Sequence, residues 1–343
     1  MTELSRRGFF GSSAGLLLAS RTNAGTANVP VALTKGESRR ANITAALDLI
    51  DKEIAAKLRN RKVVIIKPNC VSTNKQLAAT HADALQGILD YLEKRWKGPV
   101  VIAESSAGYS QEAFDNFKYA EAAREHPRLK PQLVCLNEEG LYETIHLLNG
   151  DLHIQPARLA KRLLDPDAFV ISSCMLKTHN TVIATLNVKN MCLGAPLRSK
   201  RGENPRWNDK RIYHGGIRQT HYDILLTAQR LSPNWGLGVI DGFEGMEGNG
   251  PSQGTPVNSR LAIASTDMVA ADRIGVETMG IDPEWVGYLT YCGKAEVGVY
   301  DRARIDVRGE RVEDVRKQYR MHGDIDRELQ WMGPLTELPP KLG

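Results

Sequence analysis

The sequence is short of paired cysteines, of aromatic residues and of long apolar runs. Its five cysteines, at positions 70, 135, 174, 192 and 292, form no C-x-x-C pair, so we expect neither a cysteine-only zinc site nor an iron–sulfur cluster. Aromatic residues are 6% of the chain, which supplies no aromatic stripe for an interaction or scaffold protein. No apolar run reaches the roughly 20 residues that a helix needs to cross a bilayer, so we expect no stable membrane span.

The net charge of the chain is also small. The formal net charge is +5, and it falls to +3 without Glu3, Arg6, Arg7 and Arg21, which lie in an N-terminal segment that we expect to be removed. Binding to nucleic acid usually needs a strongly basic patch or stripe. We therefore expect no nucleic-acid partner.

The N-terminal segment is typical of a twin-arginine export signal. It reads "SRRGFFGSSAGLLLAS", with Arg6 and Arg7 ahead of an uncharged run, and small residues allow cleavage after Ala24 or Ala27. Residues 1–27 are thus predicted to be the signal, the twin-arginine translocation machinery a partner, and the mature protein periplasmic or otherwise exported. The alternative is an N-terminal amphipathic or core helix.

Two further consequences follow from this signal. The twin-arginine route carries folded proteins, often with a cofactor already inserted, which favours a bound divalent metal or another cofactor. The G-x-S-x-G match at 11–15 lies inside the signal, so it does not indicate a hydrolase nucleophile.

Helical and strand-like segments alternate from about residue 42 onward. This alternation predicts an α/β fold, with a mostly parallel sheet and helices on both faces in three layers. We expect a single domain over residues 28–320 and a C-terminal tail over 321–343. The expected strands are "KVVIIKPN", "PVVIAES", "QLVCLN", "AFVISS", "GLGVID" and "RLAIAS", and the expected helices lie near 43–58, 85–96, 111–125, 221–231 and 267–279.

Polar side chains stand where several of these strands end. In parallel sheets, ligands bind beyond the carboxyl ends of the strands, so we expect these groups to share one edge and to form a cleft for a small anionic ligand. Lys67, Asn69, Glu104 and Asn190 are predicted to bind substrate there. The strand ends are Lys67 with Asn69, Glu104 with Ser105, Lys177 with His179, Asp241 with Glu244, and Asp267.

The stretch "MLKTHNTVIATLNVKNMCLG" places three basic groups among apolar residues. Isolated charges beside apolar sequence are costly to desolvate unless they are paired. Extended geometry puts Lys177 and His179 on the same side of a strand, and "TVIATLNVKN" is expected to be a short helix that carries Lys189. These three residues are predicted to bind an anion or to serve as catalytic acids and bases. A structural ion pair is the alternative.

The stretch "DGFEGMEGNGPSQG" combines glycines with three carboxylates. Carboxylate oxygens suit a divalent metal, and Asp241 and Glu244, with His214 and His221, are predicted as its ligands. An ordinary tight loop with solvated acids, and structural histidines, are the alternatives.

A basic segment precedes these histidines. "RSKRGENPRWNDKRIYHGG", residues 198–216, is rich in charge, glycine and proline. It is expected to be a solvated surface loop, although its cations could instead cover an anionic ligand.

Several of the segments described above, together with others along the chain, resemble the domain-of-unknown-function family numbered 362. The resemblance implies a single α/β domain with the matching segments around a common cleft, and it implies no reaction. Relatives often carry a ferredoxin-like C-x-x-C-x-x-C segment that is missing here. The matching pieces are "IIKPN", "AATHADALQGILDYL", "VIAES", "MLKTH", "LNVKNMCLG", "IDGFEGMEGNGPSQGTP" and "ASTDMVAADRIG".

The leading hypothesis is an exported, metal- or cofactor-dependent enzyme that acts on a small anionic substrate, such as an isomerase or a hydrolase. The alternative is a non-catalytic cell-envelope protein that binds an organic anion or a metal chelate.

Overall fold

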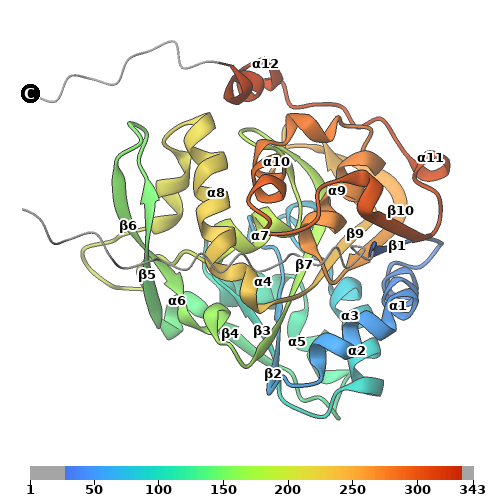
Figure 1. Cartoon of the computed structure of the whole chain (residues 1–343). Coiled ribbons are helices and arrows are strands. Elements are labelled where there is room, and N and C mark those ends of the chain that lie inside the picture. The colour runs from blue at the N-terminus through green and yellow to red at the C-terminus, as the bar shows by residue number, and fades with distance from the viewer. Residues whose placement is uncertain (1–27, 334–343) are drawn as a thin grey trace, which may run out of the picture.

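A nine-stranded sheet and a separate two-stranded hairpin form the framework of the computed structural model, which describes residues 28–333 (Figure 1). The predicted export signal and residues 334–343 lie outside the described residues. The strands are β1 (Val29–Lys35), β2 (Val63–Lys67), β3 (Val100–Glu104), β4 (Gln132–Cys135), β5 (Tyr142–Leu148), β6 (Ile154–Ala160), β7 (Ala168–His179), β8 (Ile183–Thr185), β9 (Trp235–Glu247), β10 (Thr255–Ser265) and β11 (Ile305–Gly309).

Helices occupy most of the remaining chain. No helix within residues 28–333 is long and apolar enough to cross a membrane. The helices are α1 (Arg39–Leu49), α2 (Asp51–Leu58), α3 (Ala82–Arg95), α4 (Ser110–Asn116), α5 (Tyr119–Arg124), α6 (Leu136–Glu139), α7 (Asn187–Gly194), α8 (Ile217–Leu231), α9 (Met268–Thr278), α10 (Gly287–Lys294), α11 (Val312–Val315) and α12 (Ile325–Glu328).

The sheet is mostly parallel, as predicted. Its order is β11-β1-β10-β9-β7-β2-β3-β4, and β8 pairs with the end of β7. The strands from β4 through β3, β2 and β7 to β9 run parallel to one another, whereas β10 runs antiparallel to both β9 and β1. The carboxyl ends of β2, β3 and β7 therefore meet at one edge.

Helices cover both faces of the sheet (Figure 1), and each face has its own apolar core. Side chains alternate between the faces along a strand, so Phe169 belongs to the apolar cluster that includes residues of α1 and α3, while Val170 belongs to the cluster that includes residues of α7, α8 and α9. All twelve residues of β7 are buried, as expected for a strand covered on both sides. This double burial explains the long apolar run that surrounds Lys177.

Several predicted elements differ in detail. The helix expected near 43–58 is divided at Ile50, whose φ of −123° interrupts the helix. The helix expected near 111–125 is divided at Lys118, which has a left-handed φ of 59°. The segment 181–190 begins with strand β8, and the helix starts only at Asn187. Strands β1, β5, β6 and β11 were not predicted.

One strand end lies at the wrong edge for a shared cleft. Because β10 runs antiparallel to β9, Asp267 follows it at the opposite edge of the sheet. There its carboxylate accepts hydrogen bonds from the amides of Val269 and Ala270 and caps α9. The prediction that Asp267 joins the other strand ends is therefore wrong.

The part of the predicted tail that is described packs on the domain. Glu328 is fully buried, and Trp331 lies with its ring centroid 5.2 Å from that of His221 in α8. The indole of Trp331 donates a hydrogen bond to the carbonyl of Trp285. Residues up to 333 thus belong to the packed structure.

Candidate functional site

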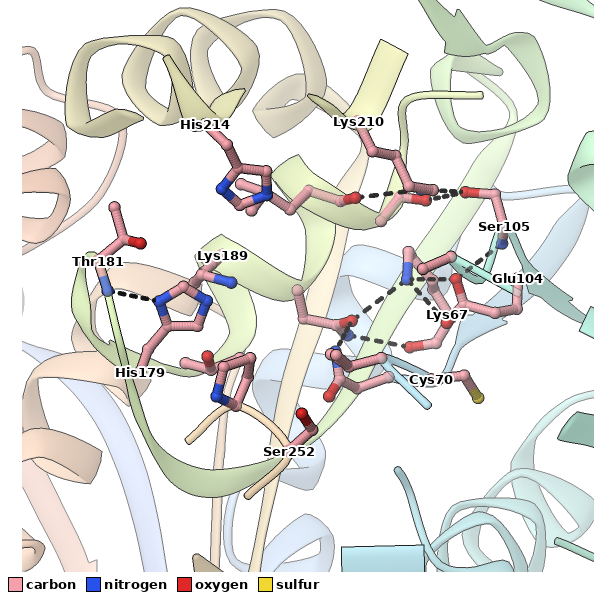
Figure 2. A pocket seen from close by; sticks show the side chains of 18 of the residues that line it. Lys67, Cys70, Glu104, Ser105, His179, Thr181, Lys189, Lys210, His214 and Ser252 are labelled. Atoms are coloured by element: carbon pink, nitrogen blue, oxygen red, sulfur yellow. Dashed lines mark hydrogen bonds and ion pairs between the residues drawn. The ribbon is translucent and has the colours of Figure 1, made fainter. Parts of the chain in front are cut away.

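A pocket of about 570 Å³ opens beyond the carboxyl ends of β2, β3 and β7 (Figure 2). Helix α7, the 3-10 helix Asp209–His214 and the loop at 251–252 complete its wall. Its polar lining consists mainly of basic and amide side chains. These are Lys67, Asn69, Asn180, Lys189, Asn190, Lys210, His179 and His214, with Glu104, Ser105, Thr181, Thr185 and Ser252.

The floor of the pocket holds a buried ion pair. The Nζ atom of Lys67 lies 3.1 Å from both carboxylate oxygens of Glu104 and 2.9 Å from the carbonyl oxygen of Pro68. The two residues are 0% and 1% exposed. They meet because β2 and β3 are adjacent parallel strands that end at the same level, as their positions in the sequence predicted.

Two asparagines connect this ion pair to Lys177. Asn190 Oδ1 accepts hydrogen bonds from Lys67 Nζ (3.2 Å) and from Asn69 Nδ2 (3.0 Å). Asn69 Oδ1 in turn accepts one from Lys177 Nζ at 2.7 Å. Burial lowers the pKa of Lys177 to about 7. Lys177 lies behind Asn69 and does not line the pocket, so it positions Asn69 and is not placed to touch a ligand directly.

Lys189 lines the pocket without a partner. Its side chain comes from the buried face of α7, whose first amides, at Asn187 and Val188, are anchored by the buried Asp272 (2.8 Å each). Lys189 is only 4% exposed, and no hydrogen bond or ion pair of its ammonium occurs within the described residues. Burial, followed by the charge of Lys177, lowers its pKa well below the usual range.

A second polar group in the pocket is also unpaired. Thr185 lines the same pocket, is 1% exposed, and its Oγ1 has no hydrogen-bond partner. Buried polar groups are normally hydrogen-bonded. The two unsatisfied groups therefore point to a ligand with acceptor oxygens in this pocket.

His179 is held as a neutral hydrogen-bond donor. Its Nδ1 accepts a hydrogen bond from the amide of Thr181 at 3.0 Å, which places the ring proton on Nε2. Burial and the charges of Lys189 and Lys177 lower its pKa well below the ordinary value. In Figure 2 its ring lies beside Lys189. His214 is more exposed and faces the same space, and desolvation and Lys189 lower its pKa as well.

Lys210 was not predicted as a site residue, and Ser105 was expected at this edge of the sheet only as the neighbour of Glu104. Lys210 Nζ donates to Ser105 Oγ (3.0 Å) and to the carbonyl of Leu193 (3.1 Å), and desolvation lowers its pKa to about 7. The only indication in the sequence was its place in the basic segment 198–216. Most of that segment is exposed as expected, but Lys210 turns into the pocket.

The predicted metal ligands are not brought together. Asp241 is buried and forms an ion pair of 2.9 Å with Arg39, and Glu244 is exposed. Neither carboxylate lines the pocket. The carboxylate that does line the pocket, together with its basic side chains, is Glu104.

His221 lies elsewhere, in the core beside α10. It is fully buried, its Nδ1 accepts a hydrogen bond from the amide of Tyr288 (3.0 Å), and its ring packs against Trp331. Within the described residues no group of three or more His, Cys, Asp or Glu side chains is placed to hold a metal ion. The predicted ligand set of Asp241, Glu244, His214 and His221 is therefore wrong as a set.

Gly194 leaves the space that the Lys67 ammonium occupies. A Cβ atom at this position would lie 2.1 Å from Lys67 Nζ, far below any van der Waals contact. We expect Gly194→Ala to displace the ammonium and to weaken binding of an organic anion such as glutarate about tenfold, because the lysine network is disturbed. Isothermal titration calorimetry measures this loss.

Gly216→Ala is the matched control, since a Cβ there meets only Gln219 Cβ at 3.9 Å. It should bind glutarate like the wild type. Unchanged affinity in Gly194→Ala would show that the position of Lys67 does not matter to the ligand.

Comparisons with known proteins give a family and two partial likenesses. The model of the family "Domain of unknown function (DUF362)" matches residues 64–277. Thylakoid-associated protein sll1697 from Synechocystis sp. (strain ATCC 27184 / PCC 6803 / Kazusa) is 31% identical over 128 residues, which are 37% of this chain and 36% of that protein. The match thus spans about a third of this relative.

A crystal structure of a Thermotoga maritima protein superposes with a TM-score of 0.41 and 8% identity, over 65% of this chain and 55% of that one. The family match covers the strands that end at the pocket, the helix that carries Lys189, and the segment after β9. The chain belongs to the DUF362 family.

Proposed function

We propose that the chain is an enzyme that binds a small organic anion in this pocket and acts on it by acid–base chemistry. The observation that carries the proposal is the Lys189 ammonium, which is 4% exposed, lines the pocket and has no partner within residues 28–333. A buried cation without a partner is costly. A carboxylate or phosphate would supply the missing charge.

The arrangement around Lys189 suits catalysis as well as binding. The Nε2–H group of His179 and the ammonium of Lys189 would donate to oxygens on which negative charge develops, which is the role of preorganised donors in many enzymes. Lys210, with a pKa of about 7, is able to take up or release a proton near neutral pH. Isomerisation or hydrolysis of a substrate, at a position next to its own carboxylate or phosphate, fits these roles.

Anion binding should weaken as the pH rises above about 7. The bound anion favours charged lysines, whereas burial lowers the pKa of Lys210 and of Lys177 to about 7 in the free protein. Binding is therefore coupled to proton uptake, and the affinity falls by up to tenfold per pH unit for each coupled proton. Calorimetry of glutarate binding, in buffers of different ionisation enthalpy, measures both the affinity and the protons taken up.

Lys210→Met should reduce this proton uptake, and Gly216→Ala should leave it unchanged. Affinity that is constant from pH 6 to 9 in the wild type would contradict the proposal that anion binding is coupled to protonation of these lysines.

His179→Gln distinguishes an enzyme from the alternative, a non-catalytic binding protein. In an enzyme, turnover falls much more than affinity with this change: the amide still donates a hydrogen bond to the bound anion, but its donor is not fixed at the position of Nε2, where charge develops during the reaction. A binding protein retains its ligand without turnover in both forms.

Export through the twin-arginine route is part of the same proposal. It is supported by the sequence of residues 1–27. Native mass spectrometry with metal analysis, on protein exported by its own signal, would identify an anion, metal or cofactor loaded before translocation. Retention of the full-length chain in the cytoplasm would contradict this part of the proposal.

A further inference from the structure

A second, smaller basic pocket adjoins the first. It has a volume of about 330 Å³, and the two pockets share Ala107 in their linings. Lys210 lines the first pocket and the next residue, Arg211, lines the second. Because consecutive Cα atoms are about 3.8 Å apart, the two pockets lie close enough for one small metabolite to extend from the first into the second.

The charged side chains that line this second pocket are all cationic. They are Arg198, Lys200, Arg206 and Arg211. Lys200, Arg206 and Arg211 are exposed, and their side chains form no ion pair within residues 28–333. Glu203, an acid of the same segment, accepts hydrogen bonds from the indole of Trp207 and the amide of Lys200, at 2.8 Å each.

The walls of the second pocket are held by stacked cations and hydrogen bonds. Arg198 lies over the ring of Tyr109 at 4.7 Å and donates to the carbonyls of Gly108 and Ser199. Arg158 covers Trp207 at 3.3 Å. Both rings thus serve to hold guanidinium groups, so the chemistry left for a ligand is that of an anion.

From this juxtaposition we infer that the substrate has two anionic groups on one short carbon frame. One group occupies the first pocket beside Lys189, and the second, a carboxylate or a phosphate, reaches the cations Arg206 and Arg211. This inference rests on the proposed anion site of the first pocket. It adds the substrate class and two specificity-determining residues.

Calorimetry with three probes tests the inference. Glutarate has two carboxylates, 3-phosphoglycerate has a carboxylate and a phosphate, and butyrate has one carboxylate. The wild type should bind at least one of the two-headed probes about tenfold or more tightly than butyrate. Arg206→Gln with Arg211→Gln should remove this advantage and leave butyrate binding within twofold, because only the second group loses its charge-assisted hydrogen bonds.

A control with the same change of net charge is Arg304→Gln with Arg316→Gln, at two exposed arginines that line neither pocket. It should leave all three affinities unchanged. The inference is overturned if the wild type does not prefer either two-headed probe, or if Arg206→Gln with Arg211→Gln weakens butyrate as much as the others. Lys189→Met should weaken all three probes, and failure there would instead count against the first pocket.

Discussion

Replacing Lys189 with Met is expected to weaken anion binding strongly and, in the same protein, to raise the free energy of unfolding. The Lys189 ammonium is 4% exposed and has no partner among the described residues, so burying it opposes folding. Met fills a similar space without a charge. We expect a gain on the order of 1–3 kcal/mol in urea unfolding at pH 7 without ligand. Anion affinity should fall about 30-fold or more, equivalent to roughly 2 kcal/mol.

The pH dependence of this gain has a definite sign. Burial lowers the pKa of Lys189 in the folded protein, so between that value and the unfolded pKa of about 10.4 the unfolded chain binds more protons. The stability of the wild type therefore rises with pH in this window, and the advantage of Lys189→Met should shrink from pH 7 to pH 9.5. Lys294→Met, at an exposed position, should leave stability unchanged. A Lys189→Met protein that is less stable than the wild type would show that the amine has a structural partner.

The sheet edge at the pocket was predictable because it follows from a simple rule. Lys67 and Glu104 end adjacent parallel strands, and Asn190 and Lys189 follow the same edge on α7. For a buried parallel sheet, apolar runs with polar ends determine which side chains meet. That prediction needed no knowledge of the loops.

The same rule failed where strand direction or side-chain pairing was decided by distant contacts. The prediction for Asp267 is wrong because β10 runs antiparallel to β9. The sequence does not show this, since an apolar run looks the same in either strand direction. Asp241 was assigned to a metal because the sequence does not show that Arg39, about two hundred residues earlier, pairs with it. Nothing in the local pattern of His221 distinguished a core histidine from a ligand.

Lys210 illustrates a third limit. It lies in an irregular, highly charged segment where no periodicity tells which side chain turns inward. Its direction is set by tertiary contacts, including the ion pair of the neighbouring Asp209 with Arg158 (2.9 Å). Such contacts become visible only once the fold is known.

Breaking the buried pair of Lys67 and Glu104 should have the largest effect on stability. Glu104→Gln keeps the shape of the side chain but leaves the Lys67 ammonium, 0% exposed, without its compensating charge. Loss of one partner of a buried pair costs about 3–5 kcal/mol, and urea unfolding should show a loss of this order. Asp167→Asn, which breaks the exposed pair with Lys62, is the matched control and should not shift the urea midpoint.

The same substitution should make stability depend on the ligand. With Glu104 neutral, Lys67 has its charge available to an anion in the pocket, so glutarate should raise the urea midpoint of Glu104→Gln more than that of the wild type. Lys67→Met with Glu104→Leu removes both charges and should recover most of the lost stability but none of this ligand dependence. Equal ligand stabilisation in the wild type and in Glu104→Gln would mean that the anion does not reach Lys67. It would confine the anion to the part of the pocket beside Lys189.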